Sequence, residues 1–356
     1  MSEVPTKVTL KTLVRHTGLS LGTVSRALQD GPEVKLETRE LVKAAARELG
    51  YTPNLAGVKL RTGKTYTLSI VLPVEDSEQD FTDSGFMALV SGLHASLAGT
   101  FYSLVVQPEL PDEDPVAGLR KLVETRRVDG LVLTQTRPQD ERIRYLLEQD
   151  FPFVSYGRSA LATPHPWYDT DHEDMAYQAT RRLIERGHRH IAMLNPPAEL
   201  MYSQHRDAGH RRALREAGIA HDPALTQCSG LSAADGRRLV LELAQRRPRP
   251  TAFVCANEYG ALGALSAFAE LGWQAGREAT VVATDDSNVS AYFVPPLSTY
   301  YASLHGAGRQ LGQLLLRRLE GEPVDQLCVL EQAALIERQP DHCSGPASQE
   351  RGGDSR

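Results

Sequence analysis

The stretch VTLKTLVRHTGLSLGTVSRALQDG, at residues 8–31, predicts two short helices joined by a tight turn. The apolar residues of both helices keep the i, i+3, i+4 spacing of a helix with one buried face. They are Leu10, Leu13 and Val14 in the first helix and Val24, Ala27 and Leu28 in the second. Thr9 and Ser20 precede these two runs, where a hydroxyl group can accept a bond from a free backbone N–H. Gly18 supplies the turn between the helices.

The predicted outward face of the second helix carries side chains suited to a nucleic acid. They are Leu21, Gly22, Thr23, Ser25, Arg26 and Gln29. Small residues and hydroxyls can lie close to a phosphate backbone, and one arginine can reach the edge of a base. The pattern is typical of a helix-turn-helix in which residues 21–29 enter the major groove. A helical hairpin without a DNA function has the same spacing, so the spacing alone leaves both interpretations open.

The whole stretch resembles the N-terminal headpiece of the LacI/GalR family of transcription regulators. Its core TVSRAL (Thr23–Leu28) stands in the recognition helix of that family, and TRELVKAAARELGYTPN at 38–54 resembles the third helix and exit. The resemblance implies double-stranded operator DNA as a partner. The DNA-binding residues that we expect are Thr9, Ser20, Leu21, Gly22, Thr23, Ser25, Arg26, Gln29, Tyr51, Asn54, Gly57, Lys59 and Leu60.

Residues 36–49 predict a third helix that closes the core of this small unit. Its apolar face is formed by Leu41, Val42, Ala45 and Leu49. Gly50 is a natural C-terminal cap, and Pro53 ends the module. Members of the family usually have Ser or a similar cap before this helix, whereas this chain has Lys35, so we expect a weaker helix start.

The polar segment NLAGVKLRTGK at 54–64 is typical of a flexible tether. The resemblance implies instead a short hinge helix that folds on the operator, where a leucine inserts between base pairs of the minor groove and bends the DNA. Leu60 stands at the position of that leucine. Gly57 stands where Ala is usual, and glycine costs about 1 kcal/mol of helix propensity. We therefore expect a hinge that is harder to order than most.

The formal charge of the 356 residues is −6, and its distribution is uneven. Residues 1–64 hold eleven Lys and Arg against six Asp and Glu, whereas the remaining residues hold 28 against 39. A basic N-terminal segment favours a polyanion-binding module. The N-terminus lacks the apolar run of a secretory signal, no run is long enough to cross a membrane, and the four cysteines lack metal-site spacing. We therefore expect a cytoplasmic protein.

From Tyr66 the pattern changes to alternating strands and helices. The first series has strands at 67–74, 102–108, 128–134 and 152–157 and helices at 85–99, 115–126 and 138–149. The alternation restarts after PHPWYDTDHED at 164–174. The second series has strands at 190–196, 251–257 and 279–286 and helices at 175–187, 204–217, 239–247, 259–271 and 304–320. Two consecutive α/β units predict two parallel-sheet lobes with a ligand cleft outside the carboxyl ends of the strands.

The second series also resembles the LacI/GalR family, so the resemblance covers roughly residues 8–338. It is carried by LIERGHRHIAML at 183–194, HRDAGHRRALREAGI at 205–219, NEYGALGALSAFAELGW at 257–273, and VVATDDS followed by PPLST within 281–299. It implies a periplasmic-binding-protein-like effector domain in which Arg206, Asn257 and Asp285 grip a small sugar. The planar fork of an arginine and the two acceptor oxygens of a carboxylate suit sugar hydroxyls. By residue type alone, Arg206 is equally a solvated charge and Asp285 a helix cap.

Four further residues are candidates for the effector site. Trp167 and Tyr202 offer rings on which the C–H face of a sugar can stack, although packing between lobes explains them equally well. Ser84 and Phe86 follow the first strand of the first series. Leu231 and Ala302 stand where some members have Trp and Gln, so no particular sugar is expected.

The sequence gives no reason to expect an enzyme. It contains no HExxH, GxSxG or GxxxxGK[ST] motif, and two sequential carboxylates such as Asp285 and Asp286 usually diverge. We expect no cofactor and no metal.

The sequence therefore predicts a homodimeric repressor of sugar uptake or catabolism genes, released from a pseudo-palindromic operator by a small sugar. Its expected parts are a DNA-binding headpiece (1–53), a hinge (54–64), a two-lobed effector and dimerisation domain (65–338) and a disordered polar tail (339–356). Two alternatives remain open: a sugar-binding receptor without a DNA function, and an activator or corepressor-dependent regulator of the same family.

Overall fold

The computed structural model describes residues 8–28, 31–51, 55–74, 84–110 and 114–338. The expectations for Gln29, Asn54 and the tail at 339–356 fall on residues outside this description, as does the side chain of Ser84. The chain divides into two compact units, Met1–Thr65 and Tyr66–Arg356. Among the described helices, none has the length and apolar character needed to span a membrane.

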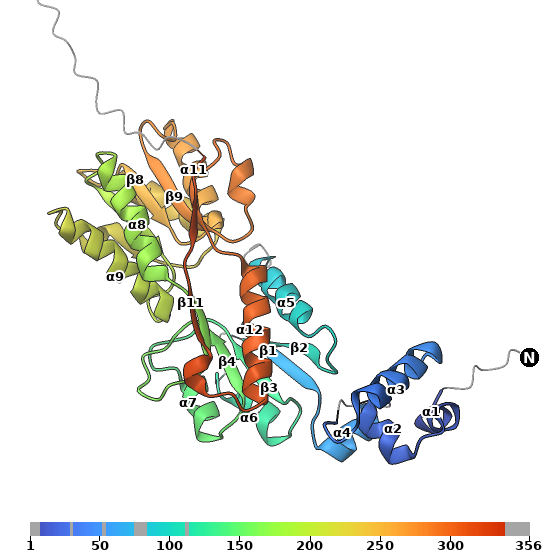
Figure 1. The fold of residues 1–356 in the computed structure, drawn as a ribbon. Helices are drawn as coiled ribbons and strands as arrows, with labels where there is room; N and C mark the ends of the chain where they lie inside the picture. Colours follow the sequence, from blue (N-terminus) through green and yellow to red (C-terminus); the bar gives the residue numbers. More distant parts are fainter. Residues whose placement is uncertain (1–7, 29–30, 52–54, 75–83, 111–113, 339–356) are drawn as a thin grey trace, which may run out of the picture. The chain divides into compact units, whose positions relative to one another are not determined.

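The smaller unit consists of helices (Figure 1). They are α1 (Leu10–Thr17), α2 (Leu21–Ala27), α3 (Leu36–Glu48) and α4 (Leu55–Thr62). Gly18 ends α1 in a left-handed conformation, with φ of 69°, that glycine adopts without strain. Ser20 begins α2, and its Oγ accepts a hydrogen bond from the backbone N–H of Thr23 at 3.1 Å. The predicted helix-turn-helix is therefore present, and the hinge segment is helical.

The core of the smaller unit joins one face of each of its first three helices. Its buried members are Leu13, Val24, Ala27, Val34, Val42, Ala45 and Ala46. The prediction that Leu41 lies on this face was wrong, because its side chain is 55% exposed. Val42, Ala45 and Ala46 keep the i, i+3, i+4 spacing, and Leu41 lies about 100° away around the helix. Lys35 precedes α3 without any side-chain cap bond, as its residue type predicted.

The larger unit contains two six-stranded sheets, each with helices on both faces (Figure 1). We call them the first lobe and the second lobe. The first-lobe strands are β1 (Thr67–Pro73), β2 (Ser103–Glu109), β3 (Gly130–Leu133), β4 (Phe153–Tyr156), β5 (Trp167–Thr170) and β11 (Cys328–Glu331). The second-lobe strands are β6 (Ile191–Asn195), β7 (Thr226–Cys228), β8 (Ala252–Cys255), β9 (Thr280–Asp285), β10 (Thr299–Tyr301) and β12 (Ala334–Ile336). The predicted α/β class and two-lobed architecture are confirmed.

Helices α5 (Ser84–Ser96) and α12 (Leu304–Leu319) cover one face of the first-lobe sheet, and α6 (Ala117–Glu124) and α7 (Glu141–Glu148) cover the other. Alternate residues of one strand serve the two faces: Leu68 and Ile70 pack with α5 and α12, whereas Val71 packs with α6 and α7. The strand order is β11-β5-β4-β3-β1-β2, and all the pairings are parallel.

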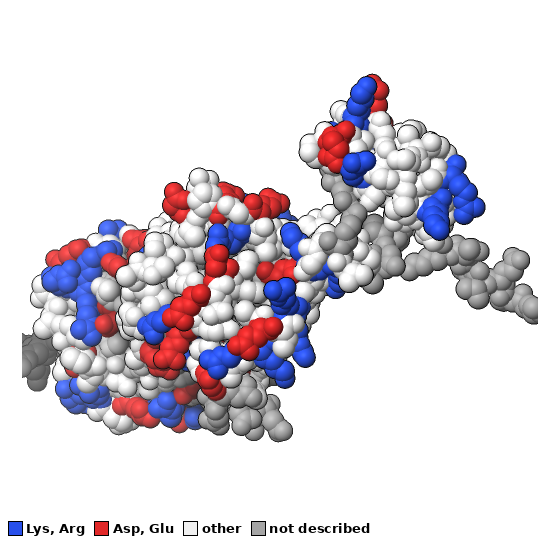
Figure 2. Space-filling view, turned by 90° about the horizontal axis from the view of Figure 1, so that it is seen from below, with Lys and Arg blue, Asp and Glu red and all other residues white. Residues whose placement is uncertain are grey.

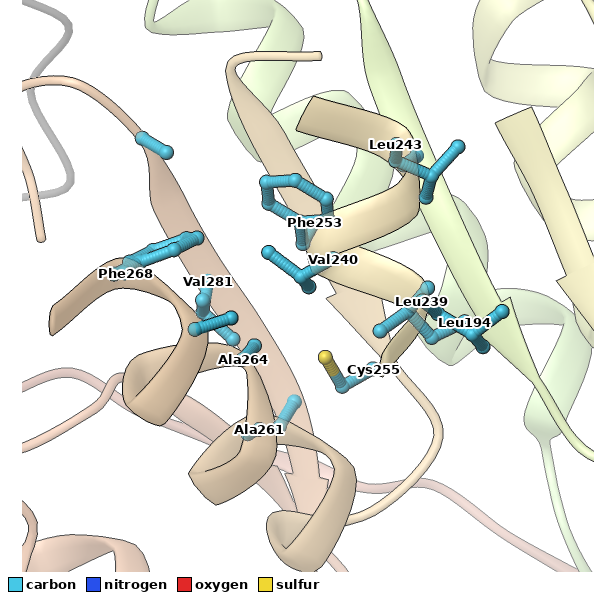
Figure 3. Close-up of a cluster of buried hydrophobic side chains, with 14 of the residues drawn as sticks. Leu194, Leu239, Val240, Leu243, Phe253, Cys255, Ala261, Ala264, Phe268 and Val281 are labelled. Atoms are coloured by element: carbon cyan, nitrogen blue, oxygen red, sulfur yellow. The ribbon is translucent and has the colours of Figure 1, made fainter. Parts of the chain in front are cut away.

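The second lobe repeats this plan. Helices α8 (His172–Glu185) and α9 (Met201–Glu216) cover one face of its sheet, and α10 (Ala233–Ala244) and α11 (Glu258–Leu271) cover the other. The strand order is β12-β10-β9-β8-β6-β7, with β12 antiparallel to β10. Figure 3 shows the core under α10 and α11, where Phe253 and Phe268 meet and the Cys255 thiol is enclosed. Cys255 is fully buried, as predicted.

The chain passes between the lobes three times. It leaves the first lobe after β5, returns to it between β10 and α12, and leaves again between β11 and β12. Five strands were not predicted from the sequence: β5, β7, β10, β11 and β12. Helix α10 begins at Ala233, whereas the predicted helix begins at residue 239. Three of these strands have only three residues each, which is too short for a period of two to be visible.

Glycines bring three helix pairs into close contact. A Cβ on Gly308 of α12 would lie 2.0 Å from the carbonyl oxygen of Leu89 in α5. A Cβ on Gly209 of α9 would lie 2.0 Å from the carbonyl oxygen of Glu173 in α8, and one on Gly263 of α11 would meet α10 at the same distance. No other residue fits these positions without moving a helix. The contact of Gly209 with α8 explains the glycine within HRDAGHRRALREAGI at 205–219.

Candidate functional site

The smaller unit presents the outward face of α2. Leu21, Gly22 and Arg26 are exposed there, and Thr23 and Ser25 are half-buried. The Arg26 Nε donates to the carbonyl oxygen of Gly22 at 3.2 Å, and it lies 3.7 Å from a Glu33 carboxylate oxygen. The Arg26 guanidinium is therefore folded along its own helix, held by weak surface contacts from which it can swing outward.

The other expected DNA contacts lie around this helix and on α4. Thr9 and Ser20 are exposed at the starts of α1 and α2. Tyr51 packs against the core of the smaller unit, and burial raises the pKa of its phenol. Gly57, Lys59 and Leu60 are exposed on α4, and the Leu60 side chain is 90% exposed. An isolated apolar side chain exposed to this degree is available for contact with a partner.

Charged side chains of both signs are interspersed over the visible face of the larger unit (Figure 2). This mixture is typical of a solvated surface rather than a polyanion-binding one.

A cavity of about 180 Å³ lies between the first and second lobes. A water needs roughly 10–15 Å³ on this measure, so the cavity has room for on the order of a dozen waters. Its lining residues are Pro73, Gly85, Phe86, Thr134, Gln135, Thr136, Tyr156, Gly157, Asp169, Thr170, His172, Tyr202, Leu231, Ala256, Asn257, Glu258, Tyr259, Thr284, Asp286, Ala302 and Leu304. As predicted for parallel sheets, most of them follow the carboxyl ends of strands.

The first-lobe wall carries mainly neutral polar groups. The hydroxyl of Thr134 donates to the carbonyl of Val71 at 2.9 Å, and that of Thr136 donates to the carbonyl of Arg158 at 2.7 Å. Gln135 lies between them in a left-handed conformation with φ of 49°, which is uncommon for a residue with a side chain. Such strain recurs at ligand sites, where the surrounding structure holds it in place.

Asp169 is the carboxylate of this first-lobe wall. Its Oδ2 accepts from Arg158 Nε at 2.7 Å, while burial raises its pKa to about 6. His172, at the start of α8, has its Nε2 3.7 Å from Asp169 Oδ1 and its ring 5.1 Å from that of Tyr202. Burial lowers the pKa of His172 well below its ordinary value, so the imidazole is neutral at neutral pH.

Arg206 lies behind the second-lobe wall and is 99% buried, with an exposure of only 1%. Its Nε donates to Asn195 Oδ1 at 3.0 Å, and its Nη1 donates to Thr284 Oγ1 at 3.2 Å. Its Nη2 has no hydrogen-bond partner among the described residues. Burial lowers the pKa of this guanidinium to about 10, so it remains charged. Arg206 is not among the residues that line the cavity, so its predicted role in gripping a ligand stays a prediction.

Asn257 lines the cavity, but its amide is already engaged at the start of α11. Its Oδ1 accepts from the backbone N–H of Gly260 at 2.9 Å, and its Nδ2 donates to the carbonyl of Leu231 at 2.9 Å. One N–H and one lone pair of the amide remain for a ligand.

The prediction for Asp285 needs correction. This carboxylate is fully buried, does not line the cavity and accepts the backbone N–H groups of the turn after β9. The donors are Ser287 at 3.2 Å, Asn288 at 2.7 Å and Ser290 at 3.3 Å. Asp286 lines the cavity instead. The two sequential carboxylates therefore diverge, as expected, and the turn decides which one faces a ligand.

Asp286 forms a pair with Glu258, the first residue of α11. The two carboxyl groups are hydrogen-bonded to each other, and Glu258 Oε1 also accepts from Ser287 Oγ at 2.8 Å. Burial and the neighbouring carboxyl raise the pKa of Asp286 to about 8, and burial raises that of Glu258. A hydrogen bond between two carboxyl groups requires one proton, so the pair holds one proton and one negative charge at neutral pH.

Three aromatic residues were expected at the effector site. Phe86 and Tyr202 line the cavity, but Trp167 does not. The Trp167 ring lies 5.7 Å from the guanidinium carbon of Arg158, and its strand pairs with β4 and β11. Within the described part of the chain, no group of three His, Cys, Asp or Glu side chains is placed to hold a metal.

Comparison with known proteins places this geometry in a family. Residues 9–54 match the bacterial regulatory proteins of the lacI family, and residues 180–339 match a periplasmic binding protein-like domain. The HTH-type transcriptional regulator AglR of Rhizobium meliloti is 36% identical over 314 residues, which are 87% of this chain and 87% of that protein. The HTH-type transcriptional regulator RafR of Escherichia coli is 32% identical over 90% of this chain and 94% of its own length. The chain belongs to the LacI family.

Solved structures of LacI-family members agree with this assignment. The complex of the transcriptional regulator CelR with cellobiose has a TM-score of 0.70 and 29% identity, and the match covers 93% of this chain and 99% of that one. The lac repressor dimer bound to operator and the anti-inducer ONPF has a TM-score of 0.73 and 25% identity over 95% and 100% of the two chains. The relatives named here are transcriptional regulators, which agrees with the expectation that the chain is not an enzyme.

The cavity of this LacI-family regulator is also lined by residues that were not predicted from the sequence. Gln135, Asp169, His172 and Glu258 belong to it, and nothing in the spacing of the sequence singles them out. Leu231 and Ala302 also line it. Both are small or apolar where some members have large polar or aromatic side chains, so they leave room in the cavity.

Proposed function

We propose that this LacI-family regulator represses genes of sugar uptake or catabolism and releases its operator when a small sugar enters the cavity between the lobes. The observation that carries the proposal is the presence in one chain of an exposed helix-turn-helix and a cavity lined by both apolar and polar side chains. Residues 1–53 would serve as the headpiece, 54–64 as the hinge and 65–338 as the effector and dimerisation domain. The regulator would act in the cytoplasm, where its DNA lies.

The named relatives support both halves of the proposal. One solved relative holds cellobiose, and another holds operator DNA as a dimer. Cavity-lining hydroxyls, carboxyls and the Phe86 and Tyr202 rings are the groups with which proteins bind sugars. In this chain the ligand contacts would come from Arg206, Asn257 and Asp286, with Asp285 holding the turn.

A homodimer would supply the second headpiece that a two-fold operator requires, with half-sites about 10 bp apart. The larger unit has apolar side chains that a partner copy could cover. Val105 and Val106 are half-exposed on β2, the edge strand of the first-lobe sheet, and Tyr292 and Val294 are strongly exposed after β9. Single exposed apolar residues are common, but adjacent ones on an edge strand are a liability unless covered.

Closure of the two lobes on the ligand would control DNA binding. A ligand shifts an equilibrium only by its differential affinity for two states, and a ligand held by residues of both lobes favours the closed arrangement. Closure would change the spacing of the two hinges in the dimer. Because Gly57 makes the hinge helix costly to form, a small change of spacing could melt it and release the operator.

The test is an electrophoretic mobility shift with the DNA upstream of the gene, with and without a panel of sugars. We expect Arg26→Ala to weaken operator binding by roughly 1–3 kcal/mol and to relax preference at one base pair of each half-site. Leu60→Ala should reduce the DNA bend and leave half-site preference intact, and Arg237→Ala on the surface of α10 is the control. Equal losses on operator and random DNA for both variants would contradict the assignment, and tighter binding with sugar would reverse its sign.

The hinge itself can be tested by Gly57→Ala. Nothing lies within 4 Å of a Cβ placed on Gly57, so the alanine fits. It should favour each hinge helix by about 1 kcal/mol, tighten operator binding by the dimer up to roughly 30-fold and raise the sugar concentration needed for release. Unchanged affinity and unchanged release would show that the order of this helix does not limit DNA binding.

A further inference from the structure

Three carboxyl groups line the cavity: Asp169 from the first lobe and Glu258 and Asp286 from the second. Among the described lining residues there is neither Lys nor Arg. Two arginines reach the wall from behind. Arg158 donates to Asp169 at 2.7 Å, and Arg206 donates to the wall residue Thr284 at 3.2 Å.

Acidic groups outnumber the two arginines around the cavity. Arg158 neutralises Asp169 through a direct ion pair. The Glu258–Asp286 pair makes no ion pair with Lys or Arg among the described residues, and the fully buried Asp285 adds a further carboxylate beside it. An anionic ligand would therefore enter a site whose described lining residues offer it no positive charge.

The hydrogen-bonding groups that remain are of both kinds. Arg206 Nη2 is an unused donor, Asp169 Oδ1 is a carboxylate oxygen without a hydrogen-bond partner, and His172 Nδ1 is an imidazole nitrogen without one among the described residues. A hydroxyl group both donates and accepts, so a ligand with several hydroxyls suits a site that offers both donors and acceptors. A phosphate only accepts when fully ionised, and it would leave Asp169 Oδ1 unmatched.

We propose that the cavity takes an uncharged, hydroxyl-bearing ligand and excludes phosphorylated and carboxylated ones, and that Glu258 and Asp286 decide this choice. The inference rests on the proposed function and adds the charge class of the effector. A phosphate brings close to two negative charges beside a carboxyl pair that already holds one. The regulator therefore senses its sugar before a kinase has phosphorylated it.

The experiment uses the full-length protein without DNA and isothermal titration with matched probes. The probes are glucose, maltose and cellobiose, with glucose 6-phosphate, maltose 6′-phosphate and glucosamine as charged counterparts. We expect at least one neutral sugar to bind about tenfold or more tightly than its phosphate, because like charges at close range cost several kcal/mol. In the double variant Glu258→Gln, Asp286→Asn the negative charge of the pair is gone, so the ratio should fall about tenfold or more. Glu185→Gln, an exposed carboxyl on α8, is the control and should change nothing.

A second measurement needs no ligand. The infrared difference spectrum between the wild type and Asp286→Asn near neutral pH should contain the C=O band of one protonated carboxyl group. Absence of that band, or a phosphate that binds the wild type more tightly than its neutral parent, would overturn the inference. Neither result depends on operator binding, so failure of the repressor assignment would be seen separately in the mobility shift.

Discussion

The strands of the two lobes have the same spatial order. In each sheet the second strand of the lobe lies at one edge, next to the first strand, and the last strand of the lobe lies at the opposite edge. The walls that the two lobes give to the cavity nevertheless differ. The first-lobe wall has threonines bonded to backbone carbonyls, and its carboxylate is paired with Arg158. The second-lobe wall has a proton-sharing pair and an arginine with a free donor. A repeated fold therefore fixes where a site lies, whereas single residues after the strands decide its chemistry.

The largest expected effect concerns Arg206, the buried cation behind the second-lobe wall. Arg206→Ala would leave Asn195 Oδ1 and Thr284 Oγ1 without their donor and would open a large void. We expect a loss of roughly 2–4 kcal/mol in the free energy of unfolding and loss of the ligand response, with DNA binding retained below the unfolding temperature. Operator affinity across a sugar titration and thermal unfolding measure the two effects.

Arg206→Lys is the control for this prediction, because it keeps the charge but cannot reproduce the fork of donors. It should restore most of the stability and little of the response. If Arg206→Ala still releases DNA at the wild-type sugar concentration, the second-lobe wall does not grip the ligand and the contrast between the walls fails.

A second prediction compares how the lobes hold their helices. Gly308→Ala in the first lobe and Gly209→Ala in the second each place a methyl group 2.0 Å from a carbonyl oxygen of the neighbouring helix. Both should lose roughly 1–3 kcal/mol of unfolding free energy, the cost of overpacking. Gly118→Ala in α6 is the matched control, since nothing lies within 4 Å of its Cβ, and it should gain up to about 1 kcal/mol. Denaturant titrations would show whether one lobe tolerates the methyl group better.

The smallest expected effect is a pH dependence that belongs to the second-lobe wall. The pKa of Asp286 is raised from 3.8 to about 8 in the folded protein, so the protonated form favours folding. The stability from this group is fully present below about pH 4 and is lost as the pH rises through about 8. Asp286→Asn cannot ionise, so it should lose less stability than the wild type over that range, by at least roughly 1 kcal/mol or ~2–4 °C in Tm.

Thermal unfolding of both proteins across this range is the measurement, without any ligand. Burial lowers the pKa values of His188 and His210 to about 4 and about 3. Their contribution has the opposite sign, because it is lost as the pH falls below the ordinary histidine value of 6.5, and it is common to wild type and variant. Parallel curves for the two proteins would show that Asp286 ionises normally.

The sequence predicted the long elements well, because buried strands such as Thr67–Pro73 and amphipathic helices such as α12 carry a visible period. Strands of three residues left no such trace. The choice of Asp286 over Asp285 could not be predicted, because it depends on how three backbone N–H groups turn after β9. Gln135 could not be found either, since its place in the cavity follows from a left-handed backbone. Leu41 was misplaced by a single residue on its helix.

The three passages between the lobes have a consequence for synthesis. The first-lobe sheet begins with β1 at Thr67 but is complete only when β11 has been made, at Glu331. A ribosome that adds about 5–20 residues per second needs roughly 15–50 s to cover that interval. Until α12 has been made, at Leu319, α5 lacks its partner helix, and until β11 has been made β5 lacks its edge partner, so apolar residues of the nascent lobe stay open to chaperones. A stop codon shortly before α12 would leave both lobes unfinished, although most of the chain had been translated.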